Sequence, residues 1–455
     1  MPLPLDMYQI RGARPLQGIV NISGSKNATL PLMTAALLSD EPSYIENVPN
    51  LRDVRAMIKL LQHLGAKVSF NAGTLKIDPR AFNVDTVHYD LMVRMRASFY
   101  AMGPMLARLG KAHISMPGGC AIGDRPVDIH LRGFEELGVR HHHRNGYIHA
   151  MHNSLVGTRL SLMGPNGTSV GATCNVMMAA VLAKGTTIID DAAREPEILE
   201  LANFLNSMGA RISGQGTGIL KIEGVKKLFG TNWKVCPDRI EAATFAVAAL
   251  ATHGDVTLRG VQRTACASTL FALEQWGAAM DWPEPDVLHI TRGKKEKRPL
   301  HIVTEPFPGF PTDAQSQLTA LLALTPGTSH IRETIYPERF KHVPELNRLG
   351  ANIRAAEKGK IEISGVPALE GAAVMASDLR AGAALIVAAL AAHGTSQVRR
   401  IYHVDRGYEM MEEKLRTLGA VIERQKETAE DPGMESLSLS AEEEDVTLGG
   451  EAAEG

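Results

Sequence analysis

A cysteine and an arginine share one short loop of the sequence, where together they could move a proton beside a bound anion. Cys120 precedes Arg125 by five residues within 117–128, which read Pro-Gly-Gly-Cys-Ala-Ile-Gly-Asp-Arg-Pro-Val-Asp. The three glycines and two prolines of this stretch favour a shaped loop over a helix or a strand. Because a neighbouring cation lowers the pKa of a thiol, Cys120 could exchange a proton at neutral pH. The alternative is a small buried cysteine beneath a glycine turn.

Other charged or capping residues stand where helices are expected to begin. Ser25 or Asn27 could cap a helix that starts beside Lys26, and backbone N–H groups at such a start attract anions. Residues 168–173 could cradle an anion or a sugar in the same way, and residues 309–313 form a tight turn that ends on an aspartate. Three arginines also lie at or before predicted helices: Arg96, Arg380 and Arg406. Taken singly, each is more often a solvated surface charge.

The cysteines and histidines do not form a recognisable metal-binding pattern. The four cysteines, at positions 120, 174, 236 and 266, show no CxxC or other metal spacing, which suits reduced thiols in a cytoplasm. His141, His142 and His143 are consecutive, so on a strand they alternate in direction and do not converge on one ion. We therefore expect no metal, no other cofactor and a cytoplasmic location.

The composition predicts a globular protein with an acidic tail. With 455 residues, 44% of them hydrophobic and 22% charged, the chain is long enough for two cores. Residues 426–455 hold ten Asp and Glu against one Lys and are expected to be disordered. The remaining chain holds 47 Lys and Arg against 40 Asp and Glu, which is compatible with small anionic ligands. Nothing in the sequence predicts nucleic-acid binding, a membrane helix or a secretory signal.

One pattern recurs six times along the chain and predicts a repeated unit. In each copy a helical stretch ends in a glycine followed by Ala or Val: Gly65, Gly138, Gly209, Gly277, Gly350 and Gly419. Strand-like alternation follows several of them, as at 352–354 and 421–423, which is typical of a helix with a glycine C-cap.

Apolar helices are expected about half a unit away from these glycines. The stretches 176–182, 244–251 and 383–392 are apolar nearly all round, so we expect them to be buried. Two α/β domains, each of three units with helices inside and sheets outside, would achieve this burial. The chain should pass into the second domain near residues 237–238.

Six separated motifs carry a resemblance to a known family. They lie at 24–27, 95–98, 117–128, 192–198, 310–313 and 402–409. Over residues 7–424 the chain resembles the UDP-N-acetylglucosamine 1-carboxyvinyltransferases, enolpyruvyl transferases of the EPSP synthase family. The resemblance implies two inside-out α/β barrel domains, each of three repeated βαβαββ-like units, with the active site in the cleft between them. The first domain would span 25–237, the second 1–24 and 238–425, and the tail 426–455.

The same resemblance implies a reaction and the residues that perform it. The enolpyruvyl group of phosphoenolpyruvate would pass to the 3-hydroxyl of UDP-N-acetylglucosamine by addition and elimination, the first committed step of peptidoglycan precursor synthesis. Cys120 would protonate C3 of phosphoenolpyruvate, and Asp313 would take the proton of the hydroxyl, with Lys26 and Arg406 completing the catalytic set. Residues implied to hold phosphoenolpyruvate are Lys26, Asn27, Arg125, Arg380 and Arg406. Alkylation of Cys120 by fosfomycin is also implied.

The second substrate is implied to contact a further set of residues. UDP-N-acetylglucosamine would meet Asn27, Arg96, Arg125, Pro126, Val127, Asp128, Ile129, Ser169, Val170, Gly171, Asp313 and Ile335. Many members of the family carry a lysine two residues before this serine, where the present chain has Gly167, so a diphosphate contact is missing or differently supplied. Because the implied residues come from both domains, we expect the sugar nucleotide to drive domain closure, with the Cys120 loop as a lid.

Two other functions are open at the level of sequence. A 3-phosphoshikimate 1-carboxyvinyltransferase has the same six units but lacks the Pro-Gly-Gly-Cys loop. A catalytically silent sugar-nucleotide-binding paralogue would be expected to lose some of the charged residues, all of which are present here. The sequence does not give the oligomeric state.

Overall fold

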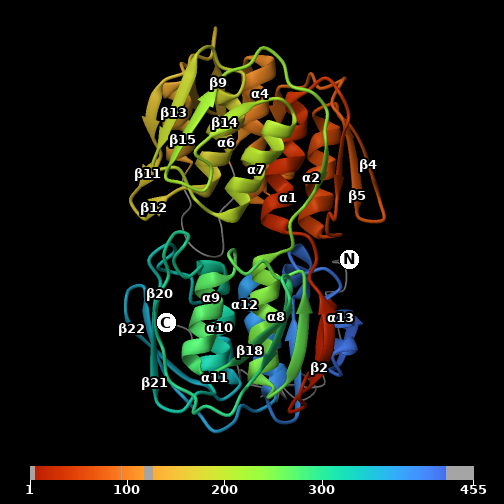
Figure 1. Cartoon of the computed structure of the whole chain (residues 1–455), viewed down its shortest axis with the longest axis vertical. Coiled ribbons are helices and arrows are strands. Elements are labelled where there is room, and N and C mark those ends of the chain that lie inside the picture. The colour runs from red at the N-terminus through yellow and green to blue at the C-terminus, as the bar shows by residue number, and fades with distance from the viewer. Residues whose placement is uncertain (1–5, 94, 117–126, 427–455) are drawn as a thin grey trace, which may run out of the picture.

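The computed structural model describes residues 6–93, 95–116 and 127–426 of the chain. Figure 1 shows two lobes stacked along the long axis of the molecule. Each lobe has its own hydrophobic core. We call the lobe whose core lies between Ala28 and Val235 the first lobe, and the lobe whose core lies in 8–22 and 242–422 the second lobe.

Three four-stranded sheets belong to the described part of the first lobe. In order of hydrogen-bonded neighbours they are β16 (Asn232–Lys234), β3 (Ser43–Glu46), β5 (Thr74–Asp78) and β4 (Lys67–Asn71); β6 (Thr86–Val87), β7 (Lys111–Ser115), β9 (Tyr147–Met151) and β8 (Arg140–Arg144); and β10 (Arg159–Ser161), β13 (Thr186–Asp190), β15 (Ile219–Glu223) and β14 (Arg211–Ser213). A short hairpin of β11 (Met163–Gly164) and β12 (Gly167–Thr168) joins the third of these sheets to the next helix.

Three further four-stranded sheets belong to the described part of the second lobe. They are β18 (Ala279–Glu284), β19 (Val287–Thr291), β17 (Asp255–Arg259) and β2 (Gln17–Asn21); β20 (His301–Val303), β21 (Thr328–Arg332), β23 (Lys360–Ser364) and β22 (Asn352–Glu357); and β24 (Ala373–Met375), β25 (Thr395–Arg399), β1 (Asp6–Arg11) and β26 (Val421–Lys426). The first two strands of the chain therefore lie in the second lobe, as Figure 1 shows for β2.

The six sheets share one pairing pattern. In the third sheet, for example, the edge strand β10 runs parallel to β13, and the pairs β13–β15 and β15–β14 are antiparallel. All six sheets have two free edges, and none closes into a barrel within the described residues. The mixed α/β class is thus confirmed, whereas the inside-out barrel stays a prediction.

The helices are α1 (Lys26–Ala35), α2 (Arg52–His63), α3 (Tyr89–Met92), α4 (Met102–Leu109), α5 (Asp128–Glu136), α6 (Val170–Ala180), α7 (Pro196–Ser207), α8 (Arg239–Ala251), α9 (Ala267–Trp276), α10 (Thr312–Leu322), α11 (Val343–Arg348), α12 (Leu379–Ala391) and α13 (Met411–Thr417), with 3₁₀ segments η1 (Ala36–Leu38), η2 (Arg96–Ala101) and η3 (Ile401–Arg406). The predicted apolar helices correspond to α6, α8 and α12, and nearly all of their residues are buried. In the second lobe α8, α10 and α12 pack on one another. The prediction that these helices are buried is confirmed.

The glycines predicted to end helices all have left-handed backbone angles, with φ between 88° and 111°. This conformation disfavours residues that carry a Cβ atom, so glycine lets the chain turn from helix to strand. The turns lead into β4, β8, β14, β18, β22 and β26. The sixfold repeat predicted from the sequence is therefore present in the described structure.

Two antiparallel segments carry the chain between the lobes. Gly24 and Pro237 form an isolated bridge, the backbone N–H of Ser25 donates to the carbonyl of Cys236 at 2.7 Å, and that of Asp238 donates to the carbonyl of Ser23 at 2.8 Å. The predicted domain boundaries, after residues 24 and 237, fall within this crossing and stay a prediction. At the other end of the chain, Lys426 is the last residue of β26, so that strand includes the first residue of the predicted tail.

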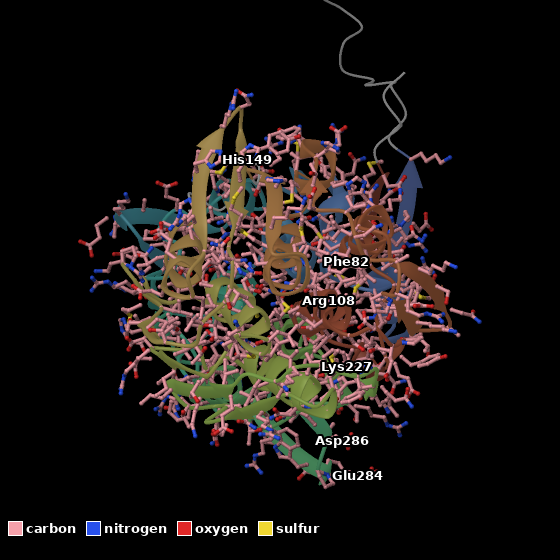
Figure 2. All side chains as sticks on the ribbon, turned by 90° about the horizontal axis from the view of Figure 1, so that it is seen from above. Phe82, Arg108, His149, Lys227, Glu284 and Asp286 are labelled. Carbon is pink, nitrogen blue, oxygen red and sulfur yellow. The ribbon has the colours of Figure 1, made fainter. Side chains whose placement is uncertain are left out.

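Arg108 links helix α4 to the segment that follows α1. Its Nη1 donates to the carbonyls of Leu37 and Ser39, at 2.9 and 2.7 Å. Its guanidinium lies 5.6 Å from the ring centroid of Phe82, and the two labelled side chains are neighbours in Figure 2. Within the described ranges, no helix is long and apolar enough to cross a membrane.

Candidate active site

A cavity of about 410 Å³ lies between the two lobes and is lined by residues of both. It brings together every described residue that was predicted to bind a substrate: Lys26, Asn27, Arg96, Val127, Asp128, Ile129, Ser169, Val170, Gly171, Asp313, Ile335, Arg380 and Arg406. Three predicted residues, Cys120, Arg125 and Pro126, lie outside the described residues. The structure places the others around one cavity, and their individual roles stay predictions.

Asp53 joins a cation of the first lobe to a cation of the second. Lys26 is the first residue of α1, and its Nζ lies 2.9 Å from Oδ2 of Asp53, near the start of α2. Arg406, the last residue of η3, donates to the same carboxylate from Nε at 2.9 Å and from Nη2 at 3.4 Å. Burial alone would raise the pKa of Asp53, but the charges of Lys26 and Arg406 hold this pKa below its ordinary value. Burial lowers the pKa of Lys26, and the Asp53 carboxylate opposes that shift.

Asp313 lies at the centre of a second polar cluster. It is in the first turn of α10, and Arg339 Nη1 donates to its Oδ1 at 2.8 Å. Its Oδ2 accepts hydrogen bonds from Arg380 Nη2 at 3.0 Å and from Asn27 Nδ2 at 3.2 Å. Burial would raise the pKa of Asp313, but the two guanidinium groups hold it well below its ordinary value. Because Asn27 belongs to the first lobe, this carboxylate is also a contact between the lobes.

Arg380 is almost completely buried at the start of α12. The carboxylate of Asp378 caps this helix and accepts from the backbone N–H of Arg380 at 3.0 Å and of Ala381 at 3.1 Å. The guanidinium donates from Nη1 to the hydroxyl of Tyr408 at 3.1 Å. The bonds to Tyr408 and Asp313 orient the guanidinium, which lines the cavity.

The start of α6 forms the wall where the sugar nucleotide was predicted to bind. Ser169 caps this helix, and its Oγ accepts from the backbone N–H of Ala172 at 3.2 Å. A Cβ atom at Gly171 would lie 3.0 Å from the imidazole of His130, so glycine allows that ring to pack against the first turn. Helix α5, which begins at Asp128, supplies this histidine. The first turn of α6 holds no acidic side chain, and this leaves it suitable for an anionic group.

The hairpin β11–β12 touches the second lobe beside this wall. Gly167 has φ +99°, and a Cβ atom there would lie 2.9 Å from Cγ of Pro306. Asn166 Nδ2 donates to the carbonyl of Ile335 at 3.3 Å. The position at which many members of the family carry a lysine is therefore occupied here by a close contact between the lobes.

Several residues of the cavity were not predicted as site residues: Asp53, Glu195, Glu197, Arg239 and Arg339. Arg239 forms a two-pronged ion pair with Glu197, at 3.0 and 3.3 Å. Both glutamates lie in the motif at 192–198, so that motif was a reason to consider them as site residues. Asp53 gave no signal, because an acidic residue in the first turn of a helix is ordinary. No pattern surrounding Arg339 distinguishes it from a surface arginine.

The described residues offer no metal site. They contain no cluster of three or more His, Cys, Asp or Glu side chains that could hold an ion. The three consecutive histidines lie on β8, where His142 and His143 are exposed. The histidines therefore lie on a largely exposed, polar strand and do not converge on one point.

The geometry suits an anion with more than one negative charge. Lys26, Arg380 and Arg406 converge on the cavity from both lobes, and fixed cations of this kind bind phosphate and carboxylate groups. Asp313 adds an ionised carboxylate among them. The arrangement can therefore hold a multiply charged anion beside an ionised carboxylate.

Comparison with known proteins decides the family. A sequence model described as EPSP synthase (3-phosphoshikimate 1-carboxyvinyltransferase) matches residues 10–415. The chain belongs to the EPSP synthase family. Within the family it is similar to UDP-N-acetylglucosamine 1-carboxyvinyltransferase 2 of Carboxydothermus hydrogenoformans, at 49% identity over 92% of this chain and 99% of that protein. It is 48% identical to UDP-N-acetylglucosamine 1-carboxyvinyltransferase of Escherichia coli, over 93% of this chain and all of that protein.

Two solved structures, of an enolpyruvyl transferase and of an EPSP synthase, share the fold. The enolpyruvyl transferase NikO from Streptomyces tendae aligns with a TM-score of 0.83 at 24% identity, over 93% of this chain and 99% of that one. EPSP synthase from Acinetobacter baumannii aligns with a TM-score of 0.70 at 16% identity, over 92% of this chain and all of that one. At these identities the likeness concerns the fold alone. The resemblance to this family found in the sequence is thus confirmed.

Proposed function

We propose that this member of the EPSP synthase family transfers the enolpyruvyl group of phosphoenolpyruvate to the 3-hydroxyl of UDP-N-acetylglucosamine and releases phosphate. The observation that carries the proposal is the identity of 48–49%, over nearly the whole length, with relatives that bear the name of this transferase. The protein is then an enzyme of peptidoglycan precursor synthesis that works in the cytoplasm.

Phosphoenolpyruvate binds among the cations of the cleft. Lys26, Arg380 and Arg406 line the cavity and face carboxylates. An entering phosphate would compete with Asp53 and Asp313 for these cations, because its charge is greater than that of a carboxylate. Arg125, which lies outside the described residues, is proposed to complete this set.

Asp313 accepts the proton of the sugar hydroxyl. It is a weak base while Arg339 and Arg380 pair with it, because the two guanidinium groups hold its pKa well below the ordinary range. Its basicity would increase once a guanidinium turns toward the phosphate, which couples proton removal to the presence of phosphoenolpyruvate. The O3–C2 bond then forms as C3 gains a proton, and elimination returns that proton and breaks the C2–O bond to phosphate.

The acid that protonates C3 is proposed to be Cys120. Burial raises the pKa of the thiols of Cys174, Cys236 and Cys266, the last to about 12. None of the three cysteines in the described part of the chain can therefore supply a proton near neutral pH. Cys120 itself lies outside the described residues, and the assignment rests on the family motif that contains it.

The finer architecture is part of the proposal. The two hydrophobic cores and the crossing at residues 23–26 and 236–239 support domains of 25–237 and of 1–24 with 238–425. The three sheets of each lobe, with buried helices between them, support an inside-out barrel of three units. The sugar nucleotide binds against the start of α6 and draws the two domains together.

Phosphate release tests the function. We expect inorganic phosphate to appear from phosphoenolpyruvate only when UDP-N-acetylglucosamine is present. Cys120→Ser should lower kcat by about 100-fold or more, which is the scale of general acid catalysis, and excess fosfomycin should abolish wild-type activity. Release with shikimate 3-phosphate instead would favour the sister activity, and no release with either acceptor would favour a silent paralogue. Full activity after fosfomycin treatment would contradict the role of Cys120.

A further inference from the structure

Glu195 occupies a helix start but does not cap that helix. It is the N-cap residue of α7, within the motif 192–198, and among the described residues its carboxylate accepts no bond from the first turn of α7. An acidic group at this place would ordinarily be stabilised by the free N–H groups of the helix. Instead, Oε1 accepts from the backbone N–H of Phe307, in the second lobe, at 3.3 Å.

The other oxygen of this carboxyl group is buried and unpaired. Oε2 of Glu195 is shielded from solvent and has no hydrogen-bond partner in the part of the chain that the structure describes. The residue lines the cavity between the lobes. Since buried polar atoms are nearly always paired in folded proteins, an unpaired oxygen on a residue that lines the cavity points to a ligand as its partner.

The surroundings of Glu195 raise its pKa above the ordinary value. Burial raises the pKa of Glu195, and the charge of Glu197 adds to the shift, whereas Arg239 opposes it. Arg239 is itself engaged by Glu197 at 3.0 Å, which reduces its effect on Glu195. A further titratable neighbour among the described residues, Cys174, is a buried thiol whose pKa burial raises. A protonated Glu195 would carry a hydroxyl group that can donate a hydrogen bond.

We infer that Glu195 is a further binding residue for the acceptor substrate, in which Oε2 bonds an uncharged oxygen of the sugar while Oε1 retains the backbone N–H of Phe307. The inference rests on the function proposed above. A second carboxylate, Glu197, lies beside it and disfavours an anionic ligand group at this place. The charged phosphates of both substrates are expected at the cations instead. Glu195 would thus contact the neutral part of the sugar nucleotide through one oxygen and the second lobe through the other.

Two substitutions of Glu195 test the inference. In Glu195→Ala the hydrogen bond is lost, and we expect the Kd of UDP-N-acetylglucosamine, measured by calorimetry, and its KM to rise about 10-fold. The KM of phosphoenolpyruvate at saturating acceptor should change by less than about 3-fold. In Glu195→Gln the amide can still donate from the same position, so we expect an affinity within about 3-fold of wild type at pH 6.

The pH dependence of sugar-nucleotide binding distinguishes a hydrogen bond donated by protonated Glu195 from a purely structural role of this residue. In the wild type, affinity for UDP-N-acetylglucosamine should fall as pH rises through the raised pKa of Glu195. Glu195→Gln should lack this component. An identical pH profile in the two proteins would overturn the inference, and so would an unchanged Kd in Glu195→Ala.

A neighbouring glutamate provides the control. Glu200 lies on the same helix and accepts from Trp233 Nε1 at 3.0 Å and from the backbone N–H of Cys236 at 2.9 Å, away from the cavity lining. Glu200→Ala should lower Tm without changing the Kd of the sugar nucleotide. If wild type shows neither phosphate release nor binding of UDP-N-acetylglucosamine, the proposed function fails. If wild type is active and Glu195→Ala binds normally, only the present inference fails.

Discussion

The carboxylate of Asp53 holds two cations that come from different lobes. Lys26 and Arg406 would repel one another, and with Arg380 they place three positive charges around one cavity. A buried carboxylate offsets part of this repulsion and fixes the directions of the two side chains. Asp53 is therefore a positioning residue for the phosphoenolpyruvate site that we propose.

Replacing Asp53 by Asn should weaken phosphoenolpyruvate binding. Lys26 would lose its negative partner while Arg380 and Arg406 still lower its pKa, so it would lose its proton at a lower pH than in the wild type. We expect KM for phosphoenolpyruvate to rise about 10-fold, and the alkaline limb of the kcat/KM profile to move to lower pH. The unfolding free energy should also fall, by about 3 kcal/mol, because a buried ion pair is broken.

The Asp190–Arg159 pair supplies a control for Asp53. Arg159 Nε lies 2.6 Å from Asp190 Oδ2 on the surface of the first lobe, away from the cavity. Asp190→Asn should leave both the KM of phosphoenolpyruvate and the pH profile unchanged. A profile in Asp53→Asn that matches the wild type would contradict the positioning role, even if stability falls.

At the scale of elements, the hairpin β11–β12 determines how closely the lobes approach. Gly167→Ala would place a Cβ atom 2.9 Å from Pro306 in a left-handed backbone conformation. We expect the unfolding free energy to fall by about 1 kcal/mol. The hairpin would also be displaced from the second lobe, so kcat/KM for UDP-N-acetylglucosamine should fall by about 10-fold.

Gly185 provides a control in which a substitution strains the backbone without affecting a contact between the lobes. It has φ +88°, and a Cβ atom there would meet nothing within 4 Å. Gly185→Ala should therefore lower stability by a similar amount, measured by denaturant unfolding, without changing the kinetics. Equal kinetic effects in the two variants would refute the role assigned to the hairpin.

Elements with a strong local pattern could be predicted from the sequence. The six helix-ending glycines, the apolar helices α8 and α12 and the cap at Ser25 all depend on a few neighbouring residues, and all are present in the structure. Membership of a family supplied the rest of the candidate site, since nothing local in the sequence places Asn27 against Asp313.

Contacts between distant segments could not be predicted in this way. Asp53 and Arg406 are 353 residues apart, and no local sequence pattern at either residue indicates that they form an ion pair. Arg339 reaches Asp313 from a segment without regular structure between β21 and α11, where periodicity gives no guide. Gly167 was noticed only as a departure from a family pattern, and nothing in the sequence indicates its contact with Pro306.

At the scale of the whole molecule, two separate cores make relative motion of the lobes the default expectation. Hydrophobic packing stabilises each lobe internally, whereas the contacts described across the cleft are mostly polar: Asn27–Asp313, Asp53–Arg406 and Glu195–Phe307. Interfaces of this kind are readily opened, and a ligand that touches both sides shifts the equilibrium toward closure.

Glu409 is a contact between the lobes that lies outside the cavity lining. Its Oε1 accepts from the backbone N–H of Asn50, in the first lobe, at 2.7 Å, and its Oε2 accepts from the hydroxyl of Ser23 at 2.6 Å. Ser23 belongs to the crossing between the lobes. The carboxylate of Glu409 therefore restrains the first lobe at the hinge without contacting either proposed substrate site.

Replacing Glu409 by Ala should open the free protein and leave the ligand-bound form compact. Small-angle scattering should give the ligand-free variant a radius of gyration larger than that of the wild type by about 1 Å, against about 22 Å for a compact chain of this length. Saturating UDP-N-acetylglucosamine should bring both proteins to the same radius of gyration. The apparent affinity of the variant should be weaker, because part of the binding free energy is used to close the more open lobes.

Glu413, which is exposed near the start of α13, offers a matched control, since Glu413→Ala should scatter like the wild type. Equal scattering of wild type and Glu409→Ala in both states would show that the lobes are held by other contacts, and that closure does not depend on this hinge.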